Sequence, residues 1–277
     1  MKKITLFIFF SLLTALTQLR SQSVSIVAAE NFYGGVASQV AGTAAKVTSI
    51  MSNPNQDPHE FQTDVNTAKA VANADIVIYS GIGYDTWMEK LLASQGKSGR
   101  IVIKVSDLIG AKDGDNPHIW YDPKTMPALV KKLSVILNKP GAVVKFDDSM
   151  EPLLAKITQL RSKTAGVKVT ATEPVFGYMA SALGFEMLNY DYQVAVMNDT
   201  EPSFKETAAF EGSLKTRTAR ILFYNSQVTD PSTKRMQSIA RENGVPVVGV
   251  TETEPDNPKG YVPWMLSQLG IIESVLK

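Results

Sequence analysis

Short runs of β-branched and apolar residues alternate with longer amphipathic stretches along most of the chain. The short runs predict strands that are buried on both faces, and the stretches between them predict helices. The order strand, helix, strand, helix favours a mostly parallel sheet that is covered by helices on both sides. In the first half of the chain, strands are predicted over residues 24–28, 46–50, 76–79 and 101–105.

The pattern changes near the middle of the chain, where two amphipathic stretches follow one another at residues 124–137 and 143–161. A Lys-Pro-Gly sequence at 139–141 separates them, because proline and glycine both interrupt helices. In the second stretch apolar residues recur at close to every 3.6 positions, which predicts one long helix. The alternation then resumes, with strands predicted over residues 167–170, 186–189, 221–224 and 245–250.

This organisation predicts the α/β fold class, with two lobes that each hold a mostly parallel sheet flanked by helices. One long helix is expected to join the lobes. We place the N-terminal lobe at residues 24–141, the connecting helix at 142–165 and the C-terminal lobe at 166–277.

The N-terminus has the features of a targeting signal. Lys2 and Lys3 precede an apolar run over residues 4–16. Such a run is shorter than the ~20 residues of a membrane span and matches a secretory signal peptide. We therefore expect residues 1–23 to be a signal peptide and the mature protein to be periplasmic. A buried N-terminal helix is the less favoured alternative, since the run has no helical amphipathicity.

Composition narrows the possible functions. None of the 277 residues is cysteine, which excludes disulfides, thiolate metal ligands, cysteine nucleophiles and a lipid-modified cysteine. The chain carries 28 basic and 27 acidic side chains, for a net charge of +1. Because the net charge creates no electrostatic field that would attract a polyanion, we expect no nucleic-acid partner. We also expect the protein to be a monomer.

The chain contains only two histidines, His59 and His118, and each directly follows a proline in a polar loop. The proline stiffens the turn, so the imidazole is presented from a defined position. A lone histidine is more often an ordinary surface or core residue than a ligand, but two in matching loops favour a shared role. Each loop follows a predicted strand, and open α/β sheets bind ligands beyond the carboxyl ends of their strands.

Acidic residues occupy the corresponding positions of the second lobe. Glu173 follows the strand predicted to end at residue 170, and Glu252 and Glu254 follow the last strand. An ordinary interpretation exists for each, since acidic residues are common at helix N-termini and in solvated turns. In the alternative interpretation, two imidazoles from one lobe and two carboxylates from the other form a four-residue metal site.

Several motifs are similar to those of one known family, and they extend from residue 28 to the end of the chain. They lie at residues 28–34 (AAENFYG), 57–61 (DPHEF), 116–123 (NPHIWYDP), 173–178 (EPVFGY), 197–203 (MNDTEPS), 224–230 (YNSQVTD) and 247–254 (VVGVTETE). With these motifs the chain resembles the zinc/manganese-type (cluster A-I) periplasmic solute-binding proteins of metal ABC importers.

The resemblance implies two lobes joined by a rigid helix, with Mn²⁺ or Zn²⁺ bound between them as the transported substrate. It also implies a membrane permease of an ABC importer as the partner. Carried over by motif, it implies His59, His118, Glu173 and Glu252 as the metal ligands. Many relatives have histidine where this chain has Glu173, and aspartate where it has Glu252. Carboxylates suit manganese and imidazoles suit zinc, so this ligand set is compatible with either ion.

Two other functions are compatible with a secreted α/β protein. A zinc-dependent hydrolase would need an open coordination position and a general base. No H-E-x-x-H motif occurs, and two histidines with two carboxylates already fill a tetrahedral shell, so we expect the protein not to be an enzyme. A receptor for an organic solute would line its cleft with Trp87, Trp120 and Trp264, although packing in a core or interface is the more common role of such residues.

Overall fold

The computed structural model describes residues 23–55, 61–198, 200–228 and 231–276. The predicted signal peptide at residues 1–23 therefore lies almost wholly outside the described residues. Within the described ranges, no helix combines the length and the apolar character that a membrane span requires.

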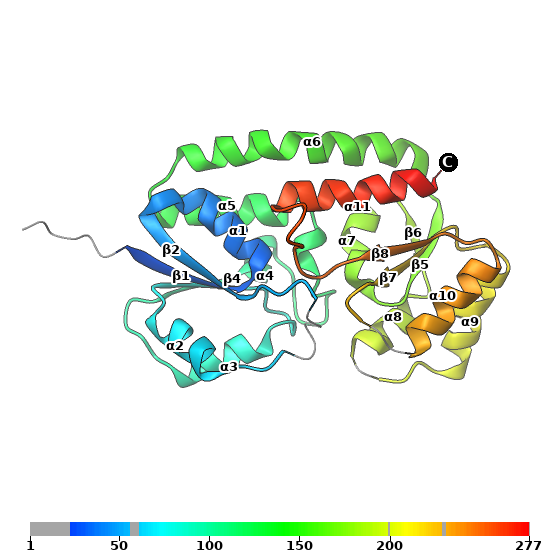
Figure 1. Cartoon of the computed structure of the whole chain (residues 1–277), viewed down its shortest axis with the longest axis horizontal. Helices are drawn as coiled ribbons and strands as arrows, with labels where there is room; N and C mark the ends of the chain where they lie inside the picture. Colours follow the sequence, from blue (N-terminus) through cyan, green and yellow to red (C-terminus); the bar gives the residue numbers. More distant parts are fainter. Residues whose placement is uncertain (1–22, 56–60, 199, 229–230, 277) are drawn as a thin grey trace, which may run out of the picture.

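The first lobe is built on a four-stranded parallel sheet in the order β2-β1-β3-β4. Alternate residues of β1 face opposite sides of this sheet. Ile26 packs with residues of α1 and α5 on one side, and Val27 packs with residues of α2 and α3 on the other. Figure 1 shows these two pairs of helices on opposite sides of the sheet. The strands are β1 (Val24–Glu30), β2 (Ala45–Met51), β3 (Ile76–Tyr79) and β4 (Ile101–Lys104). The helices are α1 (Asn31–Ala41), α2 (Val65–Asn73), α3 (Thr86–Ser94), α4 (Val105–Ile109) and α5 (Thr125–Ile136).

The second lobe repeats this arrangement, with a parallel sheet in the order β6-β5-β7-β8. On β7, Phe223 faces the core that extends toward the first lobe, and Leu222 faces a separate cluster with α9 and α10. The strands are β5 (Lys168–Ala171), β6 (Glu186–Leu188), β7 (Leu222–Asn225) and β8 (Val247–Val250). The helices are α7 (Gly177–Ala182), α8 (Tyr190–Met197), α9 (Phe204–Lys215) and α10 (Pro231–Glu242).

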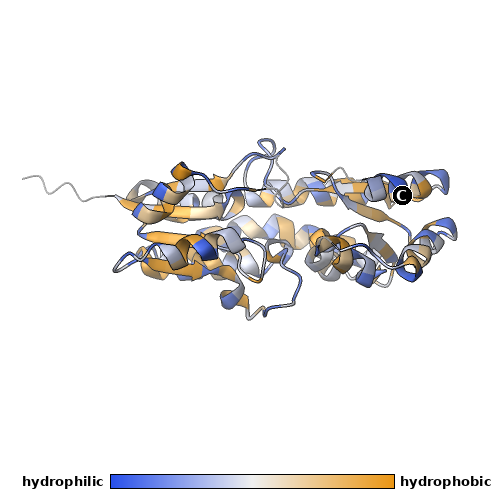
Figure 2. Cartoon of the chain, turned by 90° about the horizontal axis from the view of Figure 1, so that it is seen from below, coloured by the Kyte–Doolittle hydropathy of each residue, from blue (hydrophilic) through white to orange (hydrophobic). Residues whose placement is uncertain are grey.

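Two helices span the junction between the lobes. Helix α6 (Gly141–Thr164) has 24 residues, which corresponds to a length of about 36 Å, and it runs along both lobes (Figure 1). After β8 the chain returns and forms α11 (Tyr261–Val275) beside α6. The prediction of an α/β fold with two parallel sheets, joined by a long helix, is confirmed. Figure 2 shows the predominantly apolar character of the first sheet, as expected for strands covered on both faces.

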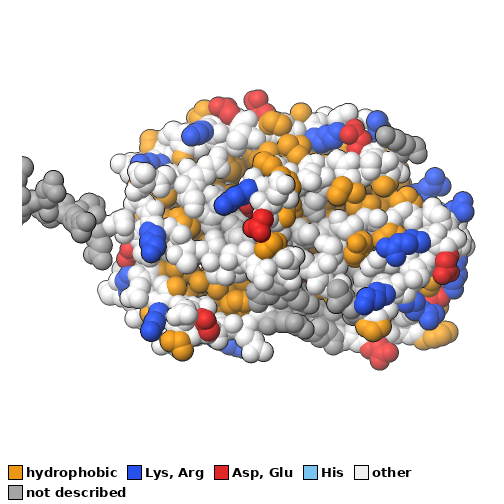
Figure 3. All heavy atoms as spheres, in the orientation of Figure 1, with side chains coloured by type: hydrophobic (Ala, Val, Ile, Leu, Met, Phe, Trp, Pro, Cys, Tyr) orange, Lys and Arg blue, Asp and Glu red, His pale blue; other side chains and the backbone are white. Residues whose placement is uncertain are grey.

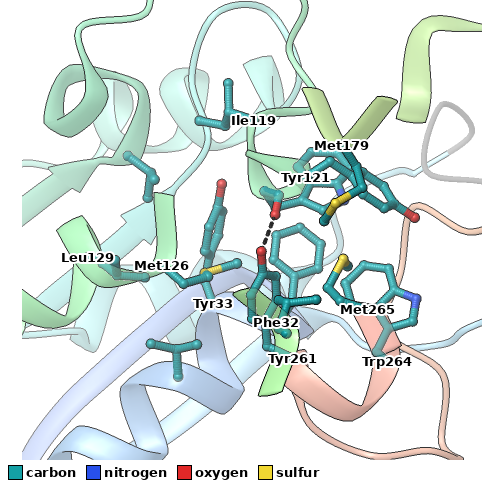
Figure 4. Packing of buried hydrophobic residues seen from close by; sticks show 14 of the residues in the cluster. Phe32, Tyr33, Ile119, Tyr121, Met126, Leu129, Met179, Tyr261, Trp264 and Met265 are labelled. Atoms are coloured by element: carbon teal, nitrogen blue, oxygen red, sulfur yellow. Dashed lines mark hydrogen bonds between the residues drawn. The ribbon is translucent and has the colours of Figure 1, made fainter. Parts of the chain in front are cut away.

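An aromatic cluster joins the lobes into one continuous core (Figure 4). The Phe32 ring stacks on Trp120 and Trp264, with centroid distances of 4.8 and 5.8 Å. The Tyr261 hydroxyl donates a hydrogen bond of 2.8 Å to the carbonyl oxygen of Trp120. Opening the lobes about a hinge would expose this apolar surface to water, which is unfavourable. The packing therefore opposes large movements between the lobes.

Two helices, α4 and α8, are present where the sequence pattern predicts none. Val105, predicted as the last residue of a strand, instead begins α4 directly after β4. In α8 only Tyr192 and Gln193 are buried, so the helix has no apolar stripe to reveal it. On the face shown in Figure 3, basic and acidic side chains are interspersed.

Candidate metal centre

The segments that follow the carboxyl ends of strands in both lobes meet at the junction. Tyr84 follows β3, His118 lies in the loop beyond α4, and Glu173 and Glu252 follow β5 and β8. Asn225 is the last residue of β7. Parallel strands place their carboxyl ends at one edge of a sheet, and here the two edges face each other.

His118 is buried at this junction, with 1% of its surface exposed. Its Nε2 atom lies 3.5 Å from Oε2 of Glu252, a contact that crosses from one lobe to the other. Its Nδ1 atom lies 2.7 Å from Oδ1 of Asn116. Nε2 has no hydrogen-bond partner among the described residues. One nitrogen is therefore held by the protein, and the other faces a carboxylate.

Glu252 is completely buried and is held from both lobes. Oε2 accepts a hydrogen bond of 2.9 Å from the Tyr84 hydroxyl, and Oε1 accepts one from Nδ2 of Asn225. The backbone N–H of Glu252 donates to Oε1 of Gln227 at 2.6 Å. These contacts fix the carboxylate in one orientation toward His118. Burial and the charge of Glu252 raise the pKa of Tyr84 well above its usual value, so its hydroxyl remains a donor.

Glu173 is buried beside Glu252, with 4% of its surface exposed. It lies at the start of a 3₁₀ turn (Pro174–Phe176) directly after β5. Its Oε2 atom accepts a hydrogen bond of 3.3 Å from Nδ2 of Asn225, the amide that also donates to Glu252. One neutral amide thus contacts two buried carboxylates. Burying two negative groups side by side is unfavourable unless positive charge offsets them, which suits a cation site.

The structure brings together three of the four residues predicted as ligands. His118 contacts Glu252 directly, and Glu173 is linked to Glu252 through Asn225. His59 lies within residues 56–60, outside the described residues. In the part of the chain that the structure describes, no three His, Cys, Asp or Glu side chains gather closely enough to hold an ion by themselves. The four-residue ligand set therefore stays a prediction.

Glu254, the other acidic residue after β8, has a different environment. Its Oε1 accepts a hydrogen bond of 2.7 Å from the backbone N–H of Gly260. Its backbone N–H and carbonyl oxygen both bond to the side-chain amide of Asn31 in the first lobe. Burial raises the pKa of the Glu254 carboxyl. Glu254 thus anchors the returning chain, whereas Glu252 faces His118.

A cleft of about 730 Å³ lies between the lobes and reaches His118. Tyr84 lines it from the first lobe, and Tyr190 and Asn198 line it from the second. None of the described residues that line it is tryptophan. Trp120 and Trp264, two of the three tryptophans that a receptor for an organic solute would use to line its cleft, are instead buried in the aromatic core.

A second buried carboxyl pair consists of Glu30, the last residue of β1, and Asp85, which follows β3. Asp85 accepts hydrogen bonds from the backbone N–H groups of Ser80 and Gly81, at 2.6 and 2.8 Å. Burial, together with the charge of Asp85, raises the pKa of Glu30 well above its usual value. Burial raises the pKa of Asp85 to about 6. Because the backbone stabilises the ionised form of Asp85, Glu30 is the member of the pair that keeps its proton to the higher pH.

The sequence reasoning did not identify Tyr84, Asn116 or Asn225 as site residues. Asn116 begins the Asn-Pro-His sequence and Asn225 ends a strand, so their positions carried a signal. Nothing in the sequence marks Tyr84, whose contact with Glu252 joins residues 168 positions apart.

Comparison with known proteins gives consistent matches over most of the chain. The profile of a family described as "Zinc-uptake complex component A periplasmic" matches residues 26–275. The iron ABC transporter substrate-binding lipoprotein MtsA of Streptococcus pyogenes serotype M1 is 23% identical over 265 residues, which cover 87% of this chain and 83% of that protein. The manganese-binding lipoprotein MntA of Halalkalibacterium halodurans is 30% identical over 181 residues, or 60% of this chain and 59% of that protein.

A solved structure has the same fold. The periplasmic zinc binding protein TroA from Treponema pallidum superposes with a TM-score of 0.71 at 20% sequence identity. The superposition covers 91% of this chain and 98% of that one. The two-lobed architecture is thus shared across nearly the whole length of both molecules.

Proposed function

Since the chain belongs to the family of zinc-uptake complex component A periplasmic proteins, we propose that it captures a divalent transition-metal ion between its lobes and delivers it to a membrane permease. The relatives are named as substrate-binding proteins of ABC transporters and as binding proteins for iron, manganese or zinc. The chain is accordingly the substrate-binding component of a metal ABC importer, and its cargo is Mn²⁺ or Zn²⁺.

The contact between His118 and Glu252 is the observation that carries this proposal. Zinc bonds of ~2.0 Å at the tetrahedral angle place two ligand atoms ~3.3 Å apart. The observed separation between Nε2 of His118 and Oε2 of Glu252 is 3.5 Å, close to the edge of such a tetrahedron. A donor from each lobe is thus positioned for one shared ion.

We propose His59, His118, Glu173 and Glu252 as the ligand set. The two imidazoles would supply neutral nitrogen donors, and the two carboxylates would offset the charge of the ion. Four protein ligands leave no open position for a reactive water at a tetrahedral ion. The site therefore suits retention and transfer of a metal, and we propose that the protein has no catalytic activity.

We further propose that the mature protein is a monomer free in the periplasm. The relatives MtsA and MntA are named as lipoproteins, and lipid attachment of that kind uses a cysteine. No cysteine occurs in the 277 residues of this chain.

Competition titration with Zn²⁺ and Mn²⁺ tests the proposal. We expect one tight equivalent per chain, because His59 and His118 are the only histidines. His118→Ala and Glu252→Gln should each weaken binding more than about 100-fold, since the loss of a ligand exceeds the effect of losing its supporting contacts.

Glu254→Gln is the matched control, because Glu254 lies in the same segment and its contact with Gly260 needs only an oxygen acceptor. Its affinity should equal that of the unmodified protein. Two tight, independent equivalents, or full affinity in His118→Ala, would contradict the proposed site. Thermal unfolding of each variant would identify any loss of affinity that arises from misfolding.

A further inference from the structure

Asn116 lies two residues before His118, and its side chain spans the junction between the lobes. Its Oδ1 atom accepts a hydrogen bond of 3.1 Å from the backbone N–H of His118 and lies 2.7 Å from Nδ1 of the same residue. Its Nδ2 atom donates a hydrogen bond of 2.6 Å to the carbonyl oxygen of Pro174 in the second lobe. The amide of Asn116 therefore contacts His118, a predicted ligand in the first lobe. It also contacts Pro174, which directly follows Glu173, a predicted ligand in the second lobe.

These contacts allow only one orientation of the Asn116 amide. A backbone N–H can only donate, so the atom facing the N–H of His118 must be the oxygen. A carbonyl oxygen can only accept, so the atom facing Pro174 must be the nitrogen. Because the oxygen also faces Nδ1 of His118, that nitrogen must carry the hydrogen. In a neutral imidazole, Nε2 then has the lone pair.

We infer that Asn116 is a positioning residue that holds His118 in the Nδ1–H tautomer and ties it to the segment carrying Glu173. The lone pair of Nε2 is then directed toward Glu252, the arrangement that a metal ion requires of an imidazole. The metal-binding consequence rests on the proposed function, whereas the tautomer is a property of the protein without metal.

Two residues of the second lobe, Gly177 and Tyr178, pack closely around Asn116. Gly177 lies so close that a Cβ atom there would be 2.8 Å from Nδ2 of Asn116. The Tyr178 hydroxyl donates a hydrogen bond of 3.0 Å to the carbonyl oxygen of Asn116. Gly177 has φ −55° and ψ −47°, which any residue can adopt. Glycine at this position therefore provides space for Asn116, and the backbone conformation does not require it.

Nitrogen-15 NMR of the metal-free protein, labelled on histidine, tests the inference directly. The measurement is made at a pH high enough that the ring signals no longer change when the pH is raised further, so that the neutral form of each ring is observed. With two histidines in the chain, only two sets of ring signals arise, and His59→Ala assigns them. We expect His118 to be entirely Nδ1–H in the unmodified protein.

In Asn116→Ala, we expect His118 to shift toward the Nε2–H tautomer, which is favoured in free histidine. Gly177→Ala should shift it in the same direction, because the added methyl group displaces the amide. Asn116→Asp keeps an oxygen acceptor for Nδ1–H but loses the donor to Pro174, so it should retain the tautomer.

Asn31→Ala is the matched control. Asn31 also joins the lobes through both ends of its amide, to the backbone of Glu254, and neither of these two hydrogen bonds involves a histidine. The variant should leave the signals of His118 unchanged. An Nε2–H tautomer in the unmodified protein would overturn the inference, as would an unchanged tautomer in Asn116→Ala or an equal shift in Asn31→Ala.

A Zn²⁺ titration separates this inference from the proposed function. We expect Asn116→Ala to weaken Zn²⁺ binding about 10- to 100-fold, the usual effect of removing the partner of a metal-bound histidine. A protein with the Nδ1–H tautomer that binds no metal would refute the proposed function and leave the tautomer assignment standing. Tight metal binding by a protein with the Nε2–H tautomer would refute the role of Asn116 alone.

Discussion

Replacing Asn225 with aspartate tests whether its amide holds the two acidic residues of the site together. In Asn225→Asp, the donor that faces Glu173 and Glu252 becomes a third carboxyl group. Removing the partner of one buried, charged acceptor destabilises a protein by about 1.5–3 kcal/mol, so two acceptors correspond to about 3–6 kcal/mol. For a chain of this size the melting temperature falls about 2–4 °C per kcal/mol. We therefore expect the metal-free variant to melt about 6–24 °C lower.

The same substitution at Asn189 is a matched control. The Asn189 amide also donates to two side chains, the hydroxyls of Thr170 and Ser213, both at 3.0 Å. A hydroxyl can rotate and donate to a new carboxylate, so Asn189→Asp should have a much smaller effect. Its backbone is left-handed, with φ 57°, a conformation that aspartate tolerates nearly as well as asparagine.

Metal makes the prediction specific to the site. A dication that binds between Glu173 and Glu252 would offset the added negative charge at residue 225. Calorimetry with and without saturating Mn²⁺ should therefore show a smaller difference between Asn225→Asp and the unmodified protein when metal is present. If metal-free Asn225→Asp were as stable as Asn189→Asp, the amide would not be holding the carboxylates. If metal left the difference unchanged, these carboxylates would not bind it.

Two further predictions concern metal choice and pH. Glu173→His exchanges a hard anionic oxygen for a neutral nitrogen, so competition titrations should show the affinity for zinc rising relative to that for manganese. An unchanged ratio of the two affinities would mean that Glu173 does not contact the ion. The pKa of Glu30 is raised in the folded state, so the folded protein keeps a proton that the unfolded chain loses. The free energy of unfolding should therefore fall as pH rises from ~4.3 toward the folded pKa. Glu30→Gln should reduce this slope in urea unfolding between pH ~4 and ~7, and identical slopes would contradict the assignment of the proton to Glu30.

The fold could be predicted because the strands of both sheets are short, apolar and separated by amphipathic helices. The predicted strand over residues 76–79 coincides with β3, whereas the one over 245–250 begins two residues before β8. Strand ends depend on hydrogen bonds to neighbouring strands, which a hydrophobic pattern does not specify. Helix α8 was missed for a related reason, since its burial is confined to Tyr192 and Gln193.

The site was only partly predictable. His118 was identifiable because histidine is so rare in this chain, and the prediction of the family from its motifs is confirmed by the match over residues 26–275. The residues that orient the candidate ligands are neutral and common. The partner of Tyr84 lies in the other lobe, and the partners of Asn225 follow other strands. The contact between Tyr84 and Glu252 depends on how the two lobes are docked. Glu252 and Glu254 are two residues apart in one turn, and only the path of that turn distinguishes the one that faces His118.

The return of α11 to the junction has a consequence for the order in which the protein folds. As the chain is made from its N-terminus, the first lobe is complete in sequence long before Tyr261 and Trp264 have been synthesised. Those two residues cover Phe32 and Trp120, so these aromatic side chains remain without part of their packing until the last helix arrives. Contacts between residues so far apart in sequence form slowly. An incomplete first lobe would therefore expose an aromatic surface that promotes aggregation during synthesis. A chaperone that shields such surfaces would be needed most before the 15 residues of α11 have docked.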